Sequence, residues 1–186
     1  MRRDEHEGST TAPWGVIART PHNEAVAATL QREVQIRVFE RGMPVEVVGG
    51  LFRISQRLES CDTPERRGLV CFGESAGATD TLCVDPRSSE VVGVMTGADD
   101  MPVEVVNSSL EAFVETLRRF AGRFPFYDRR AGTEEIRAVA DELEAIICMC
   151  DEAALAPGGF WWTVVDGARI GDWATEDVVG WEWARA

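Results

Sequence analysis

Hydrophobic residues recur at helical spacing in three stretches of the chain. The first follows Asn23, which we expect to cap a helix, the second covers residues 109–120, and the third follows Gly132, with Thr133 as its expected cap. Apolar side chains three or four positions apart share one face of a helix, so each stretch predicts an amphipathic helix. The apolar positions are Ala27, Leu30 and Val34 in the first stretch, Leu110, Phe113, Val114, Leu117 and Phe120 in the second, and Ile136, Val139, Ala140, Leu143, Ile146 and Ile147 in the third.

Shorter apolar runs lie between the first two stretches. Residues 35–55 alternate apolar and charged positions and are interrupted by Gly42 and Pro44, which favours short strands joined by a turn. Four further runs follow, separated by segments rich in the turn formers Gly, Pro, Asp and Ser. Sequential strands with such short links must be antiparallel neighbours, because a parallel return needs a long crossover. We therefore expect an α+β fold, an antiparallel meander with helices packed at its ends or on one face. The four runs cover residues 69–72, 80–84, 91–95 and 103–106.

The length and the two ends of the chain indicate its organisation. A chain of 186 residues fits one domain. Residues 1–20 mix charged residues with Gly, Ser, Thr and Pro, so we expect a mobile leader there and a single domain over residues 21–186. The acidic start is unlike a secretory signal peptide, and no segment approaches the roughly 18 apolar residues of a membrane span. Five cysteines, an odd number, then favour free thiols in a reducing cytoplasm.

Acidic residues outnumber basic ones, and the excess grows along the chain. The 32 Asp and Glu residues face 19 basic residues, all Arg, which gives a formal net charge of −13. The balance is 0 over residues 1–60, −4 over residues 61–130 and −9 over residues 131–186. Nucleic-acid affinity depends on clustered basic side chains, so direct nucleic-acid binding is not expected. An acidic surface speeds encounters with a basic partner protein, although it also keeps a protein soluble without any partner.

The thiols and imidazoles form no recognisable catalytic or metal-binding pattern. Cys148 and Cys150 are two positions apart in a predicted helix, so their sulfurs point to different faces. The other three cysteines lack C-x-x-C spacing, and both histidines lie within the first 22 positions, away from any nucleophile they could activate. We expect buried cysteines, with no metal site and no cofactor. The three cysteines without this spacing are Cys61, Cys71 and Cys83.

Carboxylate pairs and one serine motif are the remaining candidates for catalysis. Asp99 and Asp100 lie in a predicted turn, where adjacent acids are usually solvated. The segment FGESAG at residues 72–77 has the spacing of a nucleophile elbow, but the elbow needs a helix after its turn, and a strand is predicted here. No catalytic residue is predicted. A small carboxylate-dependent hydrolase remains an alternative.

Five of the six tryptophans follow residue 160. Trp161 and Trp162 are adjacent, so they cannot both face one core in either a helix or a strand. The rings either complete the core or form a protein interface, where Trp is a favoured anchor.

The stretch VVNSSLEAFVETLRRF at residues 105–120 joins a strand to a helix. Ser108 and Glu111 fit a capping box, in which the serine accepts from the Glu111 backbone and the Glu111 side chain bonds back. The order of a strand, N-S-S-L-E-x-F and an amphipathic helix resembles the SUKH superfamily, in particular its fourth immunity-protein subfamily. The segment GLVCFGESAGATDTLCVDPRSSEVVGV at residues 68–94 and the R-G-M-P element at residues 41–44 are similar to the same subfamily.

The resemblance implies an α+β fold, no catalytic residues and a role as an antidote. Proteins of this kind bind and block a cognate bacterial toxin, commonly a nuclease or a nucleic-acid deaminase, inside the cell that produces it. A regulatory SUKH-like scaffold that binds another protein is a further alternative. From loop position and charge we expect two acidic surfaces to meet a basic toxin. The first comprises Glu74, Asp80, Asp99 and Asp100 in the meander, and the second comprises Asp172, Glu176 and Asp177 near the C-terminus.

Overall fold

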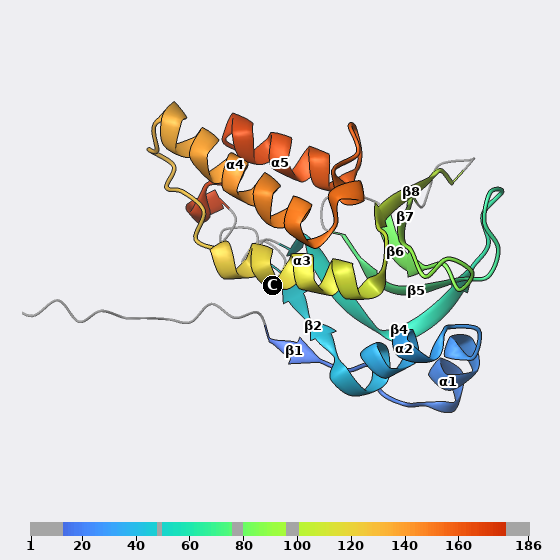
Figure 1. The fold of residues 1–186 in the computed structure, drawn as a ribbon. Coiled ribbons are helices and arrows are strands. Elements are labelled where there is room, and N and C mark those ends of the chain that lie inside the picture. The colour runs from blue at the N-terminus through green and yellow to red at the C-terminus, as the bar shows by residue number, and fades with distance from the viewer. Residues whose placement is uncertain (1–12, 48–49, 76–79, 96–100, 178–186) are drawn as a thin grey trace, which may run out of the picture.

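The computed structural model describes residues 13–47, 50–75, 80–95 and 101–177. A six-stranded antiparallel sheet in the order β3-β4-β5-β6-β7-β8 forms the centre of the fold (Figure 1). Each strand pairs with the next one in the chain, so the predicted meander is confirmed. The strands are β3 (Glu46–Val47), β4 (Phe52–Cys61), β5 (Leu69–Glu74), β6 (Asp80–Val84), β7 (Val91–Met95) and β8 (Val103–Asn107).

Three longer helices follow the sheet. They are α3 (Leu110–Arg123), α4 (Thr133–Cys150) and α5 (Phe160–Ile170), with a short 3-10 helix, η3 (Glu152–Leu155), between the last two. Figure 1 shows α3 lying against the sheet, with α4 and α5 in a further layer over α3. Phe113 of α3 packs edge-on against Phe52 of β4 and Phe72 of β5, with ring centroids 5.4 and 5.9 Å apart. The core therefore fills the space between one face of the sheet and these helices, and the predicted α+β class is confirmed.

The N-terminal helices differ from the sequence prediction. The first helix, α1 (Pro21–Ala27), begins after Thr20, whose hydroxyl accepts from the backbone N–H of Asn23 at 3.1 Å, so Asn23 is not the cap. The segment expected to form strands from residue 35 is helical as far as residue 41, through α2 (Arg32–Ile36) and a π-helical turn, η1 (Arg37–Arg41). Burial of Val34, Val38 and Phe39 explains this, because those positions share one helical face.

Gly42 stops this helical segment and turns the chain into β2 (Met43–Pro44). Its φ of 73° lies in the left-handed region, and a Cβ there would sit 2.5 Å from the carbonyl oxygen of Gly15. β2 pairs with β1 (Trp14–Gly15), and the side chain of Ile17 is fully buried in the core. Of the segment predicted as a mobile leader, residues 13–20 thus contact the fold, and residues 1–12 lie outside the described residues.

Two expected helix caps are also displaced by one residue. Ser109, not Ser108, caps α3 by accepting from the Ala112 N–H at 3.2 Å, and the Glu111 carboxylate pairs with Arg37 instead of closing a capping box. Gly132 occupies the N-cap position of α4, and Thr133 is the first helical residue. Within the described ranges, no helix combines the length and the apolar character needed to cross a membrane.

Candidate functional site

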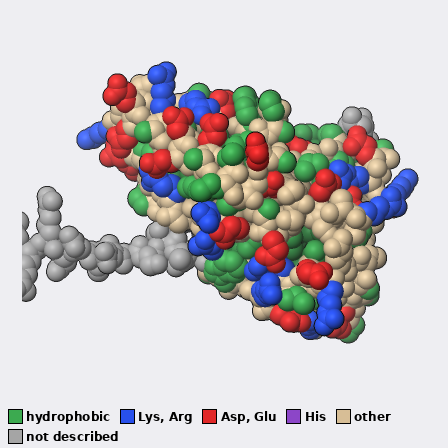
Figure 2. All heavy atoms as spheres, viewed as in Figure 1, with side chains coloured by type: hydrophobic (Ala, Val, Ile, Leu, Met, Phe, Trp, Pro, Cys, Tyr) green, Lys and Arg blue, Asp and Glu red, His purple; other side chains and the backbone are tan. Residues whose placement is uncertain are grey.

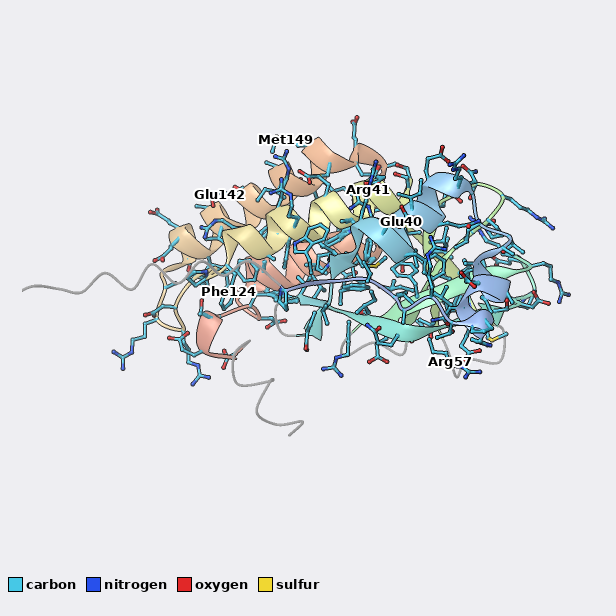
Figure 3. All side chains as sticks on the ribbon, turned by 90° about the horizontal axis from the view of Figure 1, so that it is seen from below. Glu40, Arg41, Arg57, Phe124, Glu142 and Met149 are labelled. Carbon is cyan, nitrogen blue, oxygen red and sulfur yellow. The ribbon has the colours of Figure 1, made fainter. Side chains whose placement is uncertain are left out.

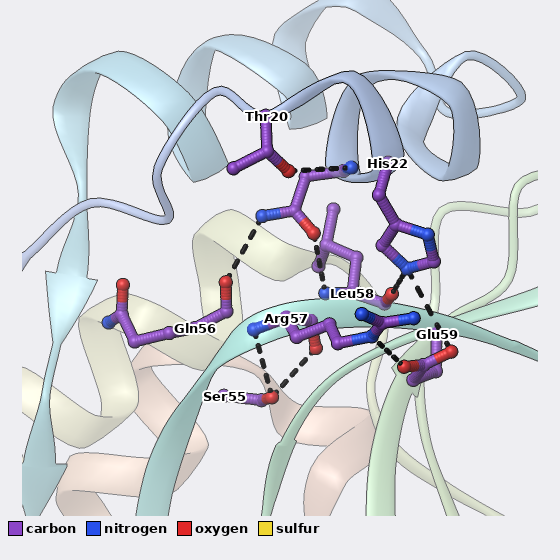
Figure 4. Close-up of polar contacts among 8 residues, drawn as sticks. Thr20, His22, Ser55, Gln56, Arg57, Leu58 and Glu59 are labelled. Atoms are coloured by element: carbon purple, nitrogen blue, oxygen red, sulfur yellow. Dashed lines mark hydrogen bonds and ion pairs between the residues drawn. The ribbon is translucent and has the colours of Figure 1, made fainter.

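The middle of β4 departs from regular pairing. Its register with β5 shifts between Ile54 and Glu59, so the intervening residues do not continue the ladder. Asn23 of α1 supplies the missing partners, because its side-chain oxygen accepts from the Leu58 N–H at 3.0 Å and its amide nitrogen donates to the Gln56 carbonyl at 3.1 Å (Figure 4). The irregular segment is therefore held in place by a buried amide on a helix far away in the sequence.

A cavity of about 430 Å³ opens beside this segment, at the β4, β5 and β6 strands. Cys71 points toward it, while Val70 and Phe72 on either side belong to the main core, so the alternation of the strand turns Cys71 away from α3. Carboxylates, a guanidinium and thiols line the cavity together with smaller residues. The lining groups that can be charged are Arg57, Glu59, Cys61, Cys71 and Glu74.

Ion pairs lie along the rim of the cavity. Arg53 donates to Glu46 at 3.0 Å and lies 3.8 Å from Glu74, while Arg57 pairs with Glu59. The hydrogen bond to Glu46 raises the pKa of Arg53 above its ordinary value. Solvated pairs of this kind contribute little to stability, so a partner's charges can replace them at small cost. The rim can therefore bind charged groups of a partner protein.

Two of the four predicted meander residues lie at this rim or next to it. Glu74 ends β5, and its side chain lines the cavity with an exposed fraction of 65%. Asp80 begins β6, and its backbone lies opposite Met95 of β7. Because Glu74 pairs in register with Thr81, Glu74 and Asp80 belong to the same end of the β5–β6 hairpin. Asp99 and Asp100 lie outside the described residues.

The second predicted surface lies at the connection between α3 and α4. The Asp177 carboxylate pairs with the Arg129 side chain, and Glu176 accepts from the Arg129 backbone N–H at 3.0 Å. Asp172 is exposed. The structure therefore brings Glu176 and Asp177 together, and it places them on a part of the fold different from the β5–β6 hairpin.

Charges of both signs cover the helical layer. Figure 2 shows acidic and arginine side chains interspersed over one face of the molecule. Arg169 of α5 donates to Glu144 at 2.6 Å and to Asp141 at 3.3 Å, and Arg123 pairs with Glu142. In Figure 3, Glu142 and Met149 of α4 lie on the side of the molecule away from Arg57. Many acids of the C-terminal region are therefore engaged within the fold, which sequence counts alone do not reveal.

The junction between β8 and α3 contains a buried polar network. The Asp151 carboxylate accepts from the Asn107 side chain at 2.9 Å and from the Ser108 N–H at 2.6 Å, and the Trp161 indole donates to Asn107 at 2.8 Å. Every group in this network has a partner, so it is architectural. Trp161 is fully buried and Trp162 is 42% exposed, which confirms that the adjacent rings face different environments. Trp181 and Trp183 lie outside the described residues.

Three thiols lie closer together than the sequence indicates. Cys71 and Cys83 face each other across β5 and β6 with their sulfurs 2.7 Å apart, and Cys61 lies diagonally from Cys71 and lines the same cavity. In the described ranges, no group of three or more His, Cys, Asp and Glu side chains has an arrangement that could hold a metal ion. C-x-x-C spacing does not identify this cluster, because the strand register creates it.

Most of the chain matches a known protein family. The model of the SUKH-4 immunity protein family matches residues 5–167 of the 186-residue chain. The match includes the sheet, the cavity and helices α1 to α4. Comparisons with curated proteins and with solved structures gave no match.

Proposed function

Because the chain belongs to the SUKH-4 immunity protein family, we propose that it is the antidote to a nucleic-acid-targeting toxin, a nuclease or a deaminase. It binds this toxin in the cytoplasm of the cell that makes both proteins and blocks its activity. The family match over residues 5–167 is the observation that carries the proposal. An immunity protein acts by binding, so the function requires no catalytic residue of its own.

The net negative charge of the chain supports a basic partner protein. Toxins that act on nucleic acid need basic surfaces to contact phosphates, and this chain has a net charge of −13. Complementary charge accelerates association and disfavours wrong partners. A partner guanidinium that approaches the Glu74 carboxylate would meet an exposed acid whose ion pair with Arg53 is long, at 3.8 Å.

The β5–β6 hairpin is the proposed centre of the contact, with Glu74 and Asp80 in it. The hairpin contributes to the cavity described above and carries the exposed Glu74 carboxylate. A side chain of the partner can enter this cavity and be desolvated there. Asp99 and Asp100, which lie between β7 and β8 in the sequence, are proposed to contact the toxin as well. Asp172, Glu176 and Asp177 form a second proposed contact, at the α3–α4 connection.

Immunity proteins are generally encoded beside their toxins, so we propose that the neighbouring gene encodes the toxin, and growth of cells that carry this gene tests the proposal. Induction of the toxin alone should arrest growth, and co-expression of this chain should restore it. The Glu74→Lys variant should protect less well, because it places a cation opposite the basic partner. Glu33→Lys makes the same charge change at an exposed position of α2 and should protect fully. If cells that express the toxin grow equally well without this chain, the antidote role is excluded.

A further inference from the structure

Cys71 and Cys83 occupy directly opposed positions in β5 and β6. Opposed residues of antiparallel strands have Cα atoms about 4.5–5.5 Å apart, which is within the span of a disulfide. Their sulfurs are 2.7 Å apart, compared with about 2.05 Å in a disulfide bond. A small displacement of the two side chains is therefore enough for bonding, with no rearrangement of the strands.

Cys61 is placed differently. Its register partner on β5 is Leu69, so it lies diagonally from Cys71. Diagonal neighbours are about 7–8 Å apart, beyond the usual span of a disulfide. Cys83, which lies directly opposite, is therefore the better disulfide partner for Cys71.

Access to the pair is asymmetric. Cys71 lines the cavity beside β4, whereas the Cys83 side chain is fully buried on the far side of Cys71. Of this pair, the Cys71 sulfur is the one that a small oxidant in the cavity meets first. Cys83 is then positioned behind that sulfur.

The hydrogen bonds of the cluster favour the thiolate at the same residue. The bond from Cys83 lowers the pKa of Cys71, whereas the same bond and burial raise the pKa of Cys83. Burial also raises the pKa of Cys61. Because the thiolate is the nucleophile in thiol oxidation, Cys71 is the reactive member of the cluster.

We propose that Cys71 and Cys83 form a peroxide-reactive pair, in which Cys71 is oxidised from the cavity and Cys83 closes a reversible cross-strand disulfide. This modification site goes beyond the proposed antidote role and does not depend on it.

The chemistry needs only hydrogen peroxide as co-reactant. The Cys71 thiolate attacks one peroxide oxygen, the O–O bond breaks, and the departing hydroxide takes a proton to become water, leaving a sulfenic acid on Cys71. The Cys83 sulfur then attacks the Cys71 sulfur, the S–O bond breaks, and the hydroxyl leaves as water with the Cys83 proton. Two thiols lose two electrons in total, and one peroxide is reduced to two waters. A dithiol reductant reverses the reaction by exchange.

Peptide mapping of the full chain tests the proposal. Trypsin cleaves after Arg67 and Arg87, so both thiols fall in one peptide, residues 68–87. After treatment with hydrogen peroxide and then iodoacetamide, this peptide should lack alkylation and weigh two hydrogens less than its reduced form. Dithiothreitol before alkylation should restore two alkylated cysteines.

Variants separate the two roles. Cys83→Ser should accumulate a sulfenic acid on Cys71, which dimedone traps, because the second thiol is absent. Cys148→Ser removes an exposed thiol of α4 and should leave the reaction of residues 68–87 unchanged. If peroxide consumes Cys148 while residues 68–87 of the wild-type chain stay fully alkylated, the proposal is wrong. The wild-type measurement decides this even if a variant fails to fold.

Discussion

The indole nitrogen of Trp161 donates a hydrogen bond to the side-chain oxygen of Asn107 over 2.8 Å, across 54 positions of sequence. It joins the start of α5 to the end of β8, two positions before Ser109, which caps α3. Asn107 also donates to Asp151, so three elements meet at one buried amide. The hydrogen bonds of Asn107 therefore connect the N-S-S motif to the F-W-W segment.

Trp161→Phe should destabilise the fold by about 1–3 kcal/mol, since it leaves the buried Asn107 oxygen without its donor. Urea unfolding at neutral pH measures the change. Trp162→Phe alters a half-exposed neighbouring ring and should shift stability by less than about 0.5 kcal/mol. If both substitutions change the free energy of unfolding equally, the Trp161–Asn107 hydrogen bond does not have this stabilising role.

Asn23→Ala should cost about 2 kcal/mol or more, because the backbone groups of Leu58 and Gln56 lose the partners that replace strand pairing. The amide of Leu58 should also exchange faster with solvent, as hydrogen exchange followed by NMR would show. Gln31→Ala is a suitable control, since Gln31 is exposed and makes no capping bond with its side chain. An unchanged Leu58 exchange rate in Asn23→Ala would refute the stated role of Asn23.

Arg66 links pH to stability. Its guanidinium donates to Glu90 at 2.6 Å and to Asp85 at 2.9 Å. The bond from Arg66 lowers the pKa of Glu90 from its ordinary value of 4.5. Burial alone would raise the pKa of Asp85, but the Arg87 N–H and Arg66 outweigh it and bring that pKa below 3.8. Both carboxyl groups therefore stay ionised in the folded chain to a lower pH than in the unfolded chain.

The sign of the pH effect follows from these two shifts. As pH falls below about 5, the unfolded chain takes up protons first, so the stabilisation is present above that range and is lost through the folded pKa values. Arg66→Gln should be less stable than wild type by about 1–2 kcal/mol at pH 7, and the difference should shrink toward pH 3. Urea unfolding over a pH series measures it. Arg67→Gln should change the pH profile less, because the backbone N–H of Gly68 contributes more than Arg67 to the lowered pKa of its exposed partner Asp62. A stability difference between Arg66→Gln and wild type that stays constant with pH would show that protonation is not the cause.

Salt should slow association with the toxin more than it speeds dissociation. Electrostatic steering by an acidic surface raises the association rate, and screening over about 8–10 Å near physiological ionic strength reduces it. Stopped-flow mixing at 50 and 500 mM salt measures both rates. An association rate that does not respond to salt would exclude charge as the basis of recognition.

The sequence predicted the meander almost to the residue. The four runs expected from residue 69 to residue 106 became β5 to β8, because short strands between turn formers leave only antiparallel neighbours. The segment around Val38 was predicted wrongly, since alternating charges resemble a strand while burial of Val34, Val38 and Phe39 follows a helix. Local patterns therefore located the sheet but not the helical entry to it.

Contacts between residues that are far apart in the sequence were harder to predict from the sequence pattern. Nothing in the spacing links Asn23 to Leu58 or Asn107 to Trp161, because each pair depends on how complete elements pack. The Cys71–Cys83 pair could have been found, since the two residues are symmetric about Gly77 in the predicted hairpin loop. For the binding surface, charge and loop position suggested Glu74, but only the fold placed it on a cavity.

The most direct test of the antidote role is calorimetric titration of the full chain with the protein encoded beside it. A catalytically inactive variant of that protein keeps the host cell viable. We expect a complex with a Kd of about 10 nM or tighter, a range typical of specific protein pairs with good complementarity. Glu74→Lys should weaken it at least about tenfold, and Glu33→Lys should not. Absence of heat and of a co-eluting complex at micromolar concentrations would contradict the antidote role.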